Sequence, residues 1–395
     1  MAQTSIYLDH AATTPMSEAV LAAYTEAATH VGNPSSIHQS GQDARAIVEN
    51  ARAAIAGALG VDPMQVEFTS GGTEASNLFL KGRTFQLQSR GVSQPVWLAT
   101  RAEHHATLDA LQWLEDHGEA RVHWLDVDDH ARMGLDSLDQ ALAEYPSDDI
   151  AGVTTLVGNN EVGSIQPVEQ IIASARRAGV AVHLDAIQAF GHIPLNLSQW
   201  RADAVTISAH KIGGPVGIGA LVVSREAAAF EPLHHGGGQQ NHRSGTLDAA
   251  GAAAFAEATR RAVADLEAEQ TRLAALSERL RQGLCTVEGV VARGAEPRLP
   301  HICHVTIDGV EGDVVLFVLD ADGIRVSIGS ACQAGVSEPS HVLLAMGLSD
   351  EVAESAVRFS LGRDTTDADI DRVLEVFSGA VSRARMAGRA DTSEH

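Results

Sequence analysis

Short β-like runs of apolar residues alternate with longer runs of helical spacing over most of this chain. Clear β-like runs cover residues 66–69, 96–99, 153–157, 180–184 and 204–207, and small or polar residues follow each of them. Strands that alternate with helices are typical of an α/β fold with a mainly parallel sheet. Because ligands bind beyond the carboxyl ends of the strands in such sheets, the polar residues found there are the first candidates for a functional site.

The start of the chain is predicted to be mostly helical. After a short apolar strand at residues 6–8, the pattern predicts a helix over 17–29 with Ser17 as its N-cap. A turn-rich stretch then leads to a long amphipathic helix from about residue 41 to 59.

The end of the chain predicts a second group of strands. One long helical run from about residue 249 to 284 leads into it. Beyond that run, β-like segments at 303–307, 324–327 and 357–360 alternate with helical ones, which indicates a smaller α/β domain.

Composition narrows the class of protein. The chain has 395 residues, of which 45% are hydrophobic and 20% charged, as in ordinary globular proteins. Its 28 Lys and Arg against 51 Asp and Glu give a net charge of -23, which argues against nucleic acid as the main partner. We expect no signal peptide and no transmembrane helix, because neither pattern is present in the sequence.

The cysteines point to a reducing compartment. Cys285, Cys303 and Cys332 are odd in number and show no Cys-x-x-Cys spacing. A disulfide framework or a structural zinc site is therefore not expected, and the cytoplasm is the simplest location.

Lysine is rare here, which draws attention to Lys211. The chain holds two lysines, Lys81 and Lys211, and the second follows the β-like run 204–207 and precedes several glycines. Asp185 follows another buried-looking strand. A carboxylate that pairs with a pyridinium nitrogen and a lysine that forms a Schiff base are the two groups that a pyridoxal phosphate enzyme needs. The simpler alternatives are a helix cap for Asp185 and a surface position for Lys211.

Four further features suit the same chemistry. The segment 70–73 lies at a strand-to-helix junction and could hold a phosphate, or be a plain capped turn. His104 could stack on a ring or carry protons, or be structural. Cys332 lies among small and polar residues that suit an exposed, reactive thiol. Arg358 lies inside a β-like run, where it suits a bidentate contact with a carboxylate.

Nine motifs in chain order carry a resemblance to a known family. They are YLDHAATT (7–14), TSGGTE (69–74), EHH (103–105), NNEVG (159–163), HLDAIQ (183–188), SAHK (208–211), RSGT (243–246), GSAC (329–332) and RFSLGR (358–363). Together they resemble the cysteine desulfurases of iron–sulfur cluster assembly, which belong to the class V aminotransferase family of pyridoxal phosphate enzymes.

The resemblance implies a fold and a division into domains. The fold would be the α/β pyridoxal phosphate transferase fold of type I, with a mainly parallel central sheet flanked by helices and a smaller α/β domain. Residues 1–14 would join the small domain, 15–255 would form the large cofactor-binding domain, and 256–386 the small C-terminal domain with the cysteine loop. The tail 387–395 is expected to be flexible.

The resemblance also implies roles for individual residues. Lys211 would bind pyridoxal 5'-phosphate as a Schiff base, and Cys332 would receive the sulfur of L-cysteine as a persulfide. The other implied cofactor contacts are Asp185 at the ring nitrogen, His104 stacked on the ring, Gln188 at the ring hydroxyl with Asn160 nearby, Gly72, Thr73, Ser208 and His210 at the phosphate, and Thr246 at the phosphate from the partner subunit of a homodimer. Arg358, with Asn33 close by, would bind the substrate carboxylate.

The chain departs from the family pattern at two places. The segment 239–242 is one residue shorter than expected and lacks the usual glutamate, which bears on the contact between Thr246 and the phosphate. Val216 stands where a lysine is common. The long segment after Cys332 resembles the branch of the family with an extended cysteine loop.

The resulting hypothesis is a cytoplasmic, homodimeric cysteine desulfurase that supplies sulfur to an iron–sulfur scaffold or a tRNA-thiolation relay. A selenocysteine lyase or another enzyme of the same family is the first alternative. A hydrolase with a metal bound by His234, His235 and His242 is an alternative from another class, although their spacing matches no strong ligand pattern.

Overall fold

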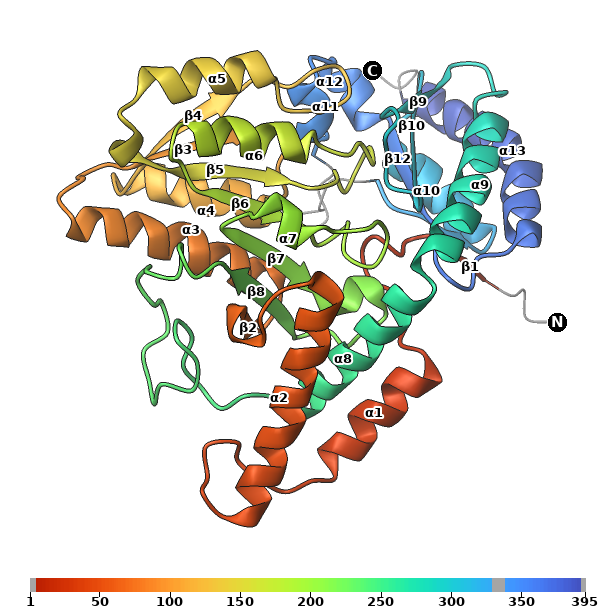
Figure 1. Ribbon diagram of the computed structural model, residues 1–395. Coiled ribbons are helices and arrows are strands. Elements are labelled where there is room, and N and C mark those ends of the chain that lie inside the picture. The colour runs from red at the N-terminus through yellow and green to blue at the C-terminus, as the bar shows by residue number, and fades with distance from the viewer. Residues whose placement is uncertain (1–4, 329–337, 392–395) are drawn as a thin grey trace.

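The computed structural model describes residues 5–328 and 338–391. Its largest element is a sheet of seven strands, shown in Figure 1 between two layers of helices. The strands, in their order across the sheet, are β2 (Val66–Thr69), β8 (Gly219–Val223), β7 (Ala204–Ser208), β6 (Val182–Asp185), β5 (Ile150–Leu156), β3 (Val96–Thr100) and β4 (Arg121–Leu125). Strands β4, β3, β5, β6 and β7 are parallel, whereas β8 is antiparallel to both of its neighbours. The predicted α/β fold with a mainly parallel sheet is confirmed.

Side chains alternate between two cores on opposite faces of this sheet. In β3, Val96 and Leu98 join the core under α2, α5, α6 and α8, while Trp97 and Ala99 join the core under α3 and α4. This period of two is what an extended strand imposes. Because both faces are covered, the strands are apolar throughout, which is why they stand out in the sequence.

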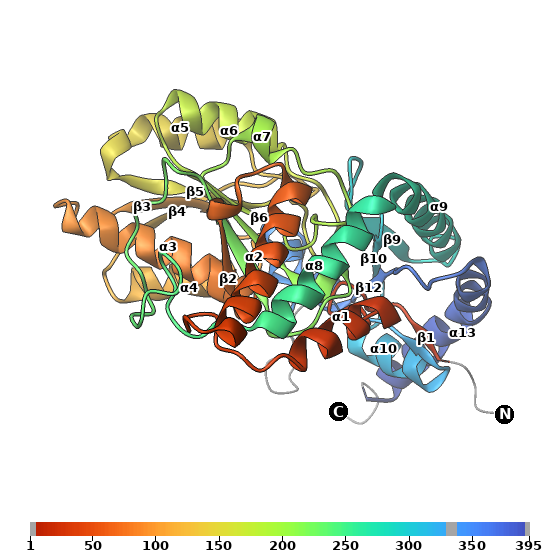
Figure 2. The ribbon, with the colours of Figure 1, turned by 60° about the horizontal axis from the view of Figure 1, so that its bottom comes forward.

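Helices cover both faces of the sheet, as Figure 2 shows from below. They are α3 (Gly72–Ser89), α4 (His105–Asp116), α5 (Leu135–Glu144), α6 (Val168–Arg177) and the single turn α7 (Leu197–Trp200), with short 3-10 turns η1 (Pro63–Gln65), η2 (Ser147–Asp149) and η3 (Ala209–Ile212). The described part of the chain contains no helix that is long and apolar enough to cross a membrane.

Three helices form the lower part of the molecule in Figure 1. They are α1 (Glu18–Ala28), α2 (Gln39–Leu59) and α8 (Ala249–Ala264). The predicted cap is confirmed, since the Ser17 hydroxyl accepts a hydrogen bond from the Val20 amide at 3.4 Å. The prediction of one helix from 249 to 284 was wrong, because α8 ends before Asp265 and α9 (Leu266–Leu284) begins after it. The two helices bury their apolar residues in different cores, which explains the break.

A second core is built around smaller sheets. One sheet has the antiparallel order β12 (Ala356–Ser360), β10 (Ile302–Ile307), β9 (Val290–Arg293), and the other pairs β1 (Ile6–Tyr7) with β11 (Ile324–Arg325). The associated helices are α9, α10 (Gly312–Ala321), α11 (His341–Ala345), α12 (Asp350–Glu354) and α13 (Asp367–Asp391). Strand β9 was not predicted, because it is a short edge strand with only its first residue buried. Helix α13 continues beyond residue 387, where the tail was expected to begin. The domain limits themselves stay a prediction.

The first strand lets the N-terminus help to form this second core. Leu8 is fully buried there together with Val305, Phe359 and Phe377. The amide of Leu8 donates to the Arg325 carbonyl at 2.8 Å, which extends the β1–β11 pairing.

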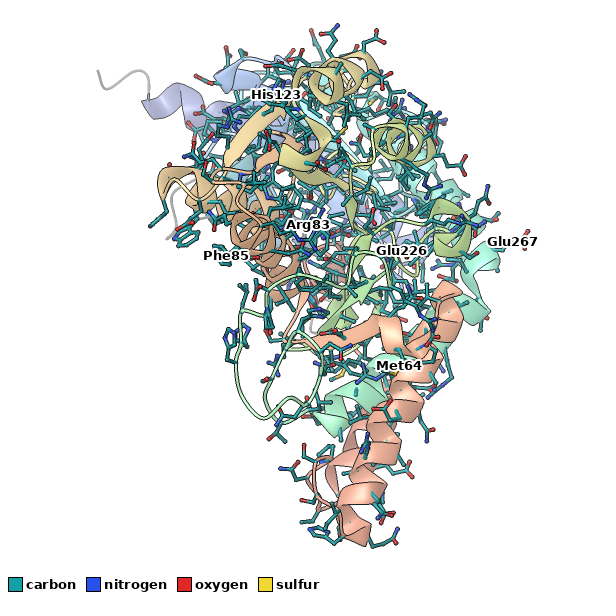
Figure 3. All side chains as sticks on the ribbon, turned by 60° about the vertical axis from the view of Figure 1, so that its left-hand side comes forward. Met64, Arg83, Phe85, His123, Glu226 and Glu267 are labelled. Atoms are coloured by element: carbon teal, nitrogen blue, oxygen red, sulfur yellow. The ribbon has the colours of Figure 1, made fainter. Side chains whose placement is uncertain are left out.

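Replacing Leu8 by alanine tests this contribution. We expect Leu8→Ala to lower the free energy of unfolding by about 2–5 kcal/mol, because it leaves a cavity in a closed core. Met64→Ala is the control, since Met64 is 68% exposed and is labelled in Figure 3, and we expect it to change the same quantity by less than about 0.5 kcal/mol. Urea unfolding followed by circular dichroism measures both, and equal losses would contradict the placement of Leu8.

Candidate functional site

A pocket of about 400 Å³ lies where both halves of the chain meet the carboxyl ends of the central strands. Leu156, Asp185 and Ser208 are the last residues of β5, β6 and β7, and all three line it. Its lining residues are Ala11, Ala12, Gly72, Thr73, His104, Ala106, Leu156, Asn160, Asp185, Ile187, Gln188, Ser208, His210, Lys211, Ser327 and Arg358. Ten of the site residues named from the sequence are therefore brought together in one place.

Lys211 lies on η3, directly after β7, and its amine is held by backbone oxygens. Nζ donates to the carbonyls of Ala11 at 2.6 Å and Ala12 at 2.8 Å. Burial, together with the guanidinium of Arg358, lowers the pKa of Lys211 to about 8, although Asp9 and Asp185 oppose the shift. A free amine, the form that attacks carbonyl groups, is therefore accessible near neutral pH.

Asp185 ends β6 and has one carboxylate oxygen to offer a ligand. Its Oδ1 accepts a hydrogen bond from the Ile187 amide at 3.0 Å, whereas the buried Oδ2 has no partner within the described residues. Burial raises the pKa of Asp185 to about 6, against the effects of that hydrogen bond and of Lys211. A cationic N–H donor placed at Oδ2 would remove the cost of burying this carboxylate.

Other polar atoms of the pocket wall also lack hydrogen-bond partners. In the described part of the chain, Asn160 Oδ1, Ser208 Oγ, His210 Nδ1 and Arg358 Nε are buried without a hydrogen-bond partner. Buried polar groups in native proteins are nearly always paired, so these atoms indicate a polar ligand. A ligand with a phosphate, a ring nitrogen and a ring oxygen has groups to pair with them, and the residues present thus fit pyridoxal phosphate.

The junction between β2 and α3 supplies a site for an anion. Gly72 and Thr73 begin α3, where the backbone N–H groups of a first helical turn have no intrahelical acceptor. Gly72 is also required by space, because a Cβ there would lie 2.0 Å from Cδ1 of Ile187. Glu74 steadies this turn by accepting hydrogen bonds from the Ser70 amide at 2.6 Å and from Arg243 Nε at 2.9 Å.

His104 caps α4 and lies in the pocket wall as a neutral ring. Its Nδ1 accepts a hydrogen bond from the Ala106 amide at 3.0 Å, so this nitrogen carries no proton. Burial, then Lys211 and His105, lower the pKa of His104 to about 4. A neutral imidazole face in this position suits stacking on an aromatic ligand.

Arg358 reaches the pocket from the middle of β12. Nη1 donates to the Asn160 carbonyl at 2.8 Å and Nη2 to Asp9 Oδ1 at 3.0 Å. These bonds fix the plane of the guanidinium, and its side chain is only 6% exposed. The sequence therefore located a charged group that is built into the pocket and is not a surface arginine.

Three expected site residues are not part of this pocket. Asn33 is exposed on the turn between α1 and α2, where its Oδ1 accepts a hydrogen bond from the Ser35 amide at 2.9 Å. Thr246 is exposed on the segment that connects β8 to α8. Cys332 lies outside the described residues. The structure does not bring Asn33 or Thr246 to the pocket of their own chain.

Six of the lining residues were not predicted, and two of these, Ala11 and Ala12, bond the amine of Lys211. Both belong to the motif at residues 7–14, but they act through their backbone carbonyls. A side chain without polar atoms gives no signal of such a role.

The segment that departs from the family pattern is anchored by its own contacts. Gln240 pairs with the backbone of Phe68, accepting from its amide at 2.7 Å and donating to its carbonyl at 2.8 Å. His242 contacts Glu67 Oε1 through Nδ1 at 2.6 Å and the Ala228 carbonyl through Nε2 at 2.6 Å. Both ring nitrogens of His242 thus face acceptors, so the protonated ring satisfies both contacts.

These contacts correct the metal hypothesis. With both nitrogens bonded, His242 has no lone pair for a metal ion. In the parts of the chain that the structure describes, no group of three or more His, Cys, Asp or Glu side chains could hold a metal ion. The proposed site of His234, His235 and His242 was therefore wrong.

Comparisons with known proteins identify the family of this chain. The family model described as Aminotransferase class-V matches residues 6–373. An "IscS-like cysteine desulfurase" of Mycobacterium tuberculosis is 44% identical over 388 residues, which cover 97% of this chain and 98% of that protein. A solved "NIFS-LIKE PROTEIN" superposes with a TM-score of 0.87 at 31% identity, covering 96% of this chain and 100% of the other. A structure described as "SspA in complex with cysteine" gives a TM-score of 0.77 at 29% identity, with 90% and 99% covered.

The His242–Glu67 pair predicts a pH dependence of stability. Although burial opposes charge, the hydrogen bonds to Glu67 and Ala228 raise the pKa of His242 above its usual 6.5. The pair therefore contributes fully below the unfolded pKa of about 6.5, and its contribution is lost as the pH rises through the raised folded pKa. His242→Asn should cost about 3 kcal/mol at pH 6, because the buried carboxylate of Glu67 loses its charged partner and keeps only the backbone amide of residue 242, and the cost should fall as the pH rises.

Urea unfolding at several pH values measures this difference. His235→Asn is the matched control, since His235 is exposed on the same segment, and it should change the free energy of unfolding little at any pH. A cost for His242→Asn that is independent of pH would show that His242 is not charged in the folded protein.

Proposed function

The chain belongs to the class-V aminotransferase family, among its cysteine desulfurases, and we propose that it converts L-cysteine to L-alanine and leaves the sulfur on Cys332 as a persulfide. Members of this family are pyridoxal phosphate enzymes. The placement of Asp185 and Lys211 at the ends of adjacent strands, inside one pocket with unpartnered polar atoms, supports this proposal most.

We assign the pocket residues to the parts of pyridoxal 5'-phosphate by their chemistry. Lys211 is the amine that binds it, Asp185 the carboxylate for the ring nitrogen, and His104 the neutral ring for its face. The first turn of α3 at Gly72 and Thr73, with Ser208 and His210, is the place for the phosphate. Gln188 and Asn160 are left for the ring oxygen. When bound, the cofactor withdraws electrons from the substrate Cα and so weakens the Cβ–S bond.

Lys211 then moves a proton. As a free amine with a pKa of about 8, Nζ would accept the Cα proton of the bound substrate at neutral pH. The carbonyls of Ala11 and Ala12 hold the amine near the pocket wall while it is not bound to a ligand. Asp185 Oδ2 would accept a hydrogen bond from a protonated ring nitrogen.

Arg358 orients the substrate. Its two terminal nitrogens are held by Asn160 and Asp9, and its buried Nε has no partner within the described residues. A substrate carboxylate in the pocket would meet this fixed positive charge. Asn33, which the resemblance places nearby, lies on an exposed turn of this chain, so we propose that it would act in the partner subunit's pocket.

Cys332 completes the reaction as a thiolate. Its sulfur attacks the substrate sulfur, so that a new S–S bond forms and the Cβ–S bond breaks. The electron pair of the broken bond goes to Cβ, which is protonated to give alanine. No external oxidant is needed, because the oxidation of sulfur to the persulfide is matched by the reduction of Cβ in alanine.

The oligomeric state, the cellular location and the sulfur acceptor are part of the same proposal. A homodimer would bring the exposed Thr246 to the phosphate in the partner subunit's pocket, and the contacts of Gln240 and His242 would hold that segment in place. We propose a cytoplasmic enzyme of the extended cysteine-loop branch, which passes its persulfide to a protein acceptor such as an iron–sulfur scaffold or a tRNA-thiolation relay.

Borohydride reduction tests the role of Lys211. We expect the purified protein to absorb visible light through bound pyridoxal phosphate, to lose this band on reduction, and to carry the reduced cofactor on the peptide that contains Lys211. Lys211→Arg should carry none. Lys81→Arg is the matched control, because Lys81 is the only other lysine of the chain, and it should be labelled like the native protein. A native protein without the band would contradict the proposed function.

Replacing the cysteines one at a time tests the sulfur step. Cys332→Ala should reduce alanine formation from cysteine by roughly 100-fold or more, because the nucleophile is gone, and should keep the absorption of the bound cofactor. Cys285→Ala is the control, since Cys285 is exposed and we give it no role. Full turnover in Cys332→Ala would contradict the persulfide mechanism, whereas selenocysteine would still release selenium in that variant if no protein thiol is required.

A further inference from the structure

Two histidines form a layer directly behind the pocket wall. The rings of His192 and His301 stack with their centroids 3.8 Å apart and an angle of 23° between their planes. His192 belongs to the turn that carries Gln188, and His301 precedes β10 in the other half of the chain. Nothing in the reaction described so far uses either ring.

Hydrogen bonds connect this layer to Lys211. His301 Nε2 lies 3.3 Å from Oε1 of Gln188. Gln188 Nε2 donates to the Ala11 carbonyl at 2.8 Å, and Lys211 Nζ donates to the same carbonyl at 2.6 Å. The Ala11 oxygen is thus shared by the amide of Gln188 and the amine of Lys211.

The proton positions in this series of hydrogen bonds follow from the Ala11 carbonyl. Because a carbonyl can only accept, the nitrogen of the Gln188 amide must face Ala11 and its oxygen must face His301. His301 Nε2 therefore carries the proton that is donated to Gln188. Its Nδ1 then carries none, and this atom is buried with no partner in the described residues. Burial, then the neighbouring His192, lower the pKa of His301 far below its usual value, which agrees with a neutral ring.

The ring of His301 has little freedom to leave this position. The residue is 1% exposed, its carbonyl accepts a hydrogen bond from the Leu361 amide at 2.8 Å, and one ring face is covered by His192. A donor held this firmly discriminates between the two orientations of the Gln188 amide. A reversed amide would place its NH₂ group against the Nε2 proton of His301 and its oxygen against that of Ala11.

We propose that His301, supported by the stacked ring of His192, is a positioning residue that fixes the amide of Gln188 so that its second N–H stays available to an acceptor in the pocket. The inference rests on the proposed function, because the acceptor is the ring oxygen of pyridoxal phosphate. A reversed Gln188 would present a carbonyl oxygen to that oxygen instead, and the two would repel. His301 acts through Gln188 and need not touch the ligand.

A double-mutant cycle in the holoenzyme tests this. In the native background, His301→Phe keeps an aromatic ring but removes the donor, and we expect the apparent pKa of the bound cofactor's absorption band to shift and turnover of cysteine to fall roughly tenfold. His301→Asn keeps a donor and should restore most of both. In a Gln188→Ala background, His301→Phe should change both by less than about twofold, because its partner is gone.

His117→Phe is the control, since His117 is exposed and has no part in this hydrogen-bonded chain, and it should behave almost like the native protein. An effect of His301→Phe that is the same in both backgrounds would overturn the proposal. So would a His301→Asn variant that is as impaired as His301→Phe.

A measurement without substitutions keeps the proposal testable if a variant does not fold. Nitrogen-15 spectra of the full chain with labelled histidine report which ring nitrogen of His301 is protonated, and the signal is assigned in the native protein through the contact of this ring with the stacked ring of His192. We expect a neutral ring protonated at Nε2. A ring protonated at Nδ1 would overturn the proposal whether or not pyridoxal phosphate binds, so that this failure is distinct from a failure of the proposed function.

Discussion

The buried guanidinium of Arg358 is the constraint on which the site depends. It comes from β12 in the smaller core, yet its partners are the carboxylate of Asp9 near the N-terminus and the carbonyl of Asn160 after β5. A buried charge left without partners costs several kcal/mol, so these three segments must meet if any of them is to be stable in its place. The contact of these three segments encloses the pocket between the central sheet and the smaller core. The backbone of Arg358 also pairs with Ser327, which brings the segment after β11 to the same wall.

Burial has opposite effects on the two groups at the centre of the pocket, and both effects favour the neutral form. It lowers the pKa of Lys211 to about 8 and raises that of Asp185 to about 6. The free amine that can attack a carbonyl group therefore becomes accessible without a separate base. The carboxylate, in turn, gains most from a ligand that brings it a proton donor.

The sequence predicted the parts of this protein whose signals are local. Strands buried on both faces are apolar runs, and Asp185 and Lys211 follow two of them, so the parallel sheet and its polar edge could be inferred. The unpredicted features depend on contacts between distant segments. The break at Asp265 arises because α8 and α9 pack in different cores, and β9 is an edge strand with little apolar character. Contact between the two halves of the chain is also required for the roles of two further groups. These are the backbone oxygens of Ala11 and Ala12, and the ring of His301 behind Gln188.

Segments from the N-terminal and C-terminal parts of the chain contact each other beside the site. The site can therefore form only after both have been synthesised. The Ala11 amide bonds to the hydroxyl of Ser360 at 2.9 Å across a separation of 349 residues, and β1 pairs with β11. During synthesis, the ribosome first releases the segment with Ala11 and Ala12, whose carbonyls hold the Lys211 amine. It releases β12, which closes the pocket, much later. The pocket can be complete only after release of β12, because Arg358 forms part of its wall. Capture of the cofactor would then be a late event, since a chain without β12 lacks Arg358.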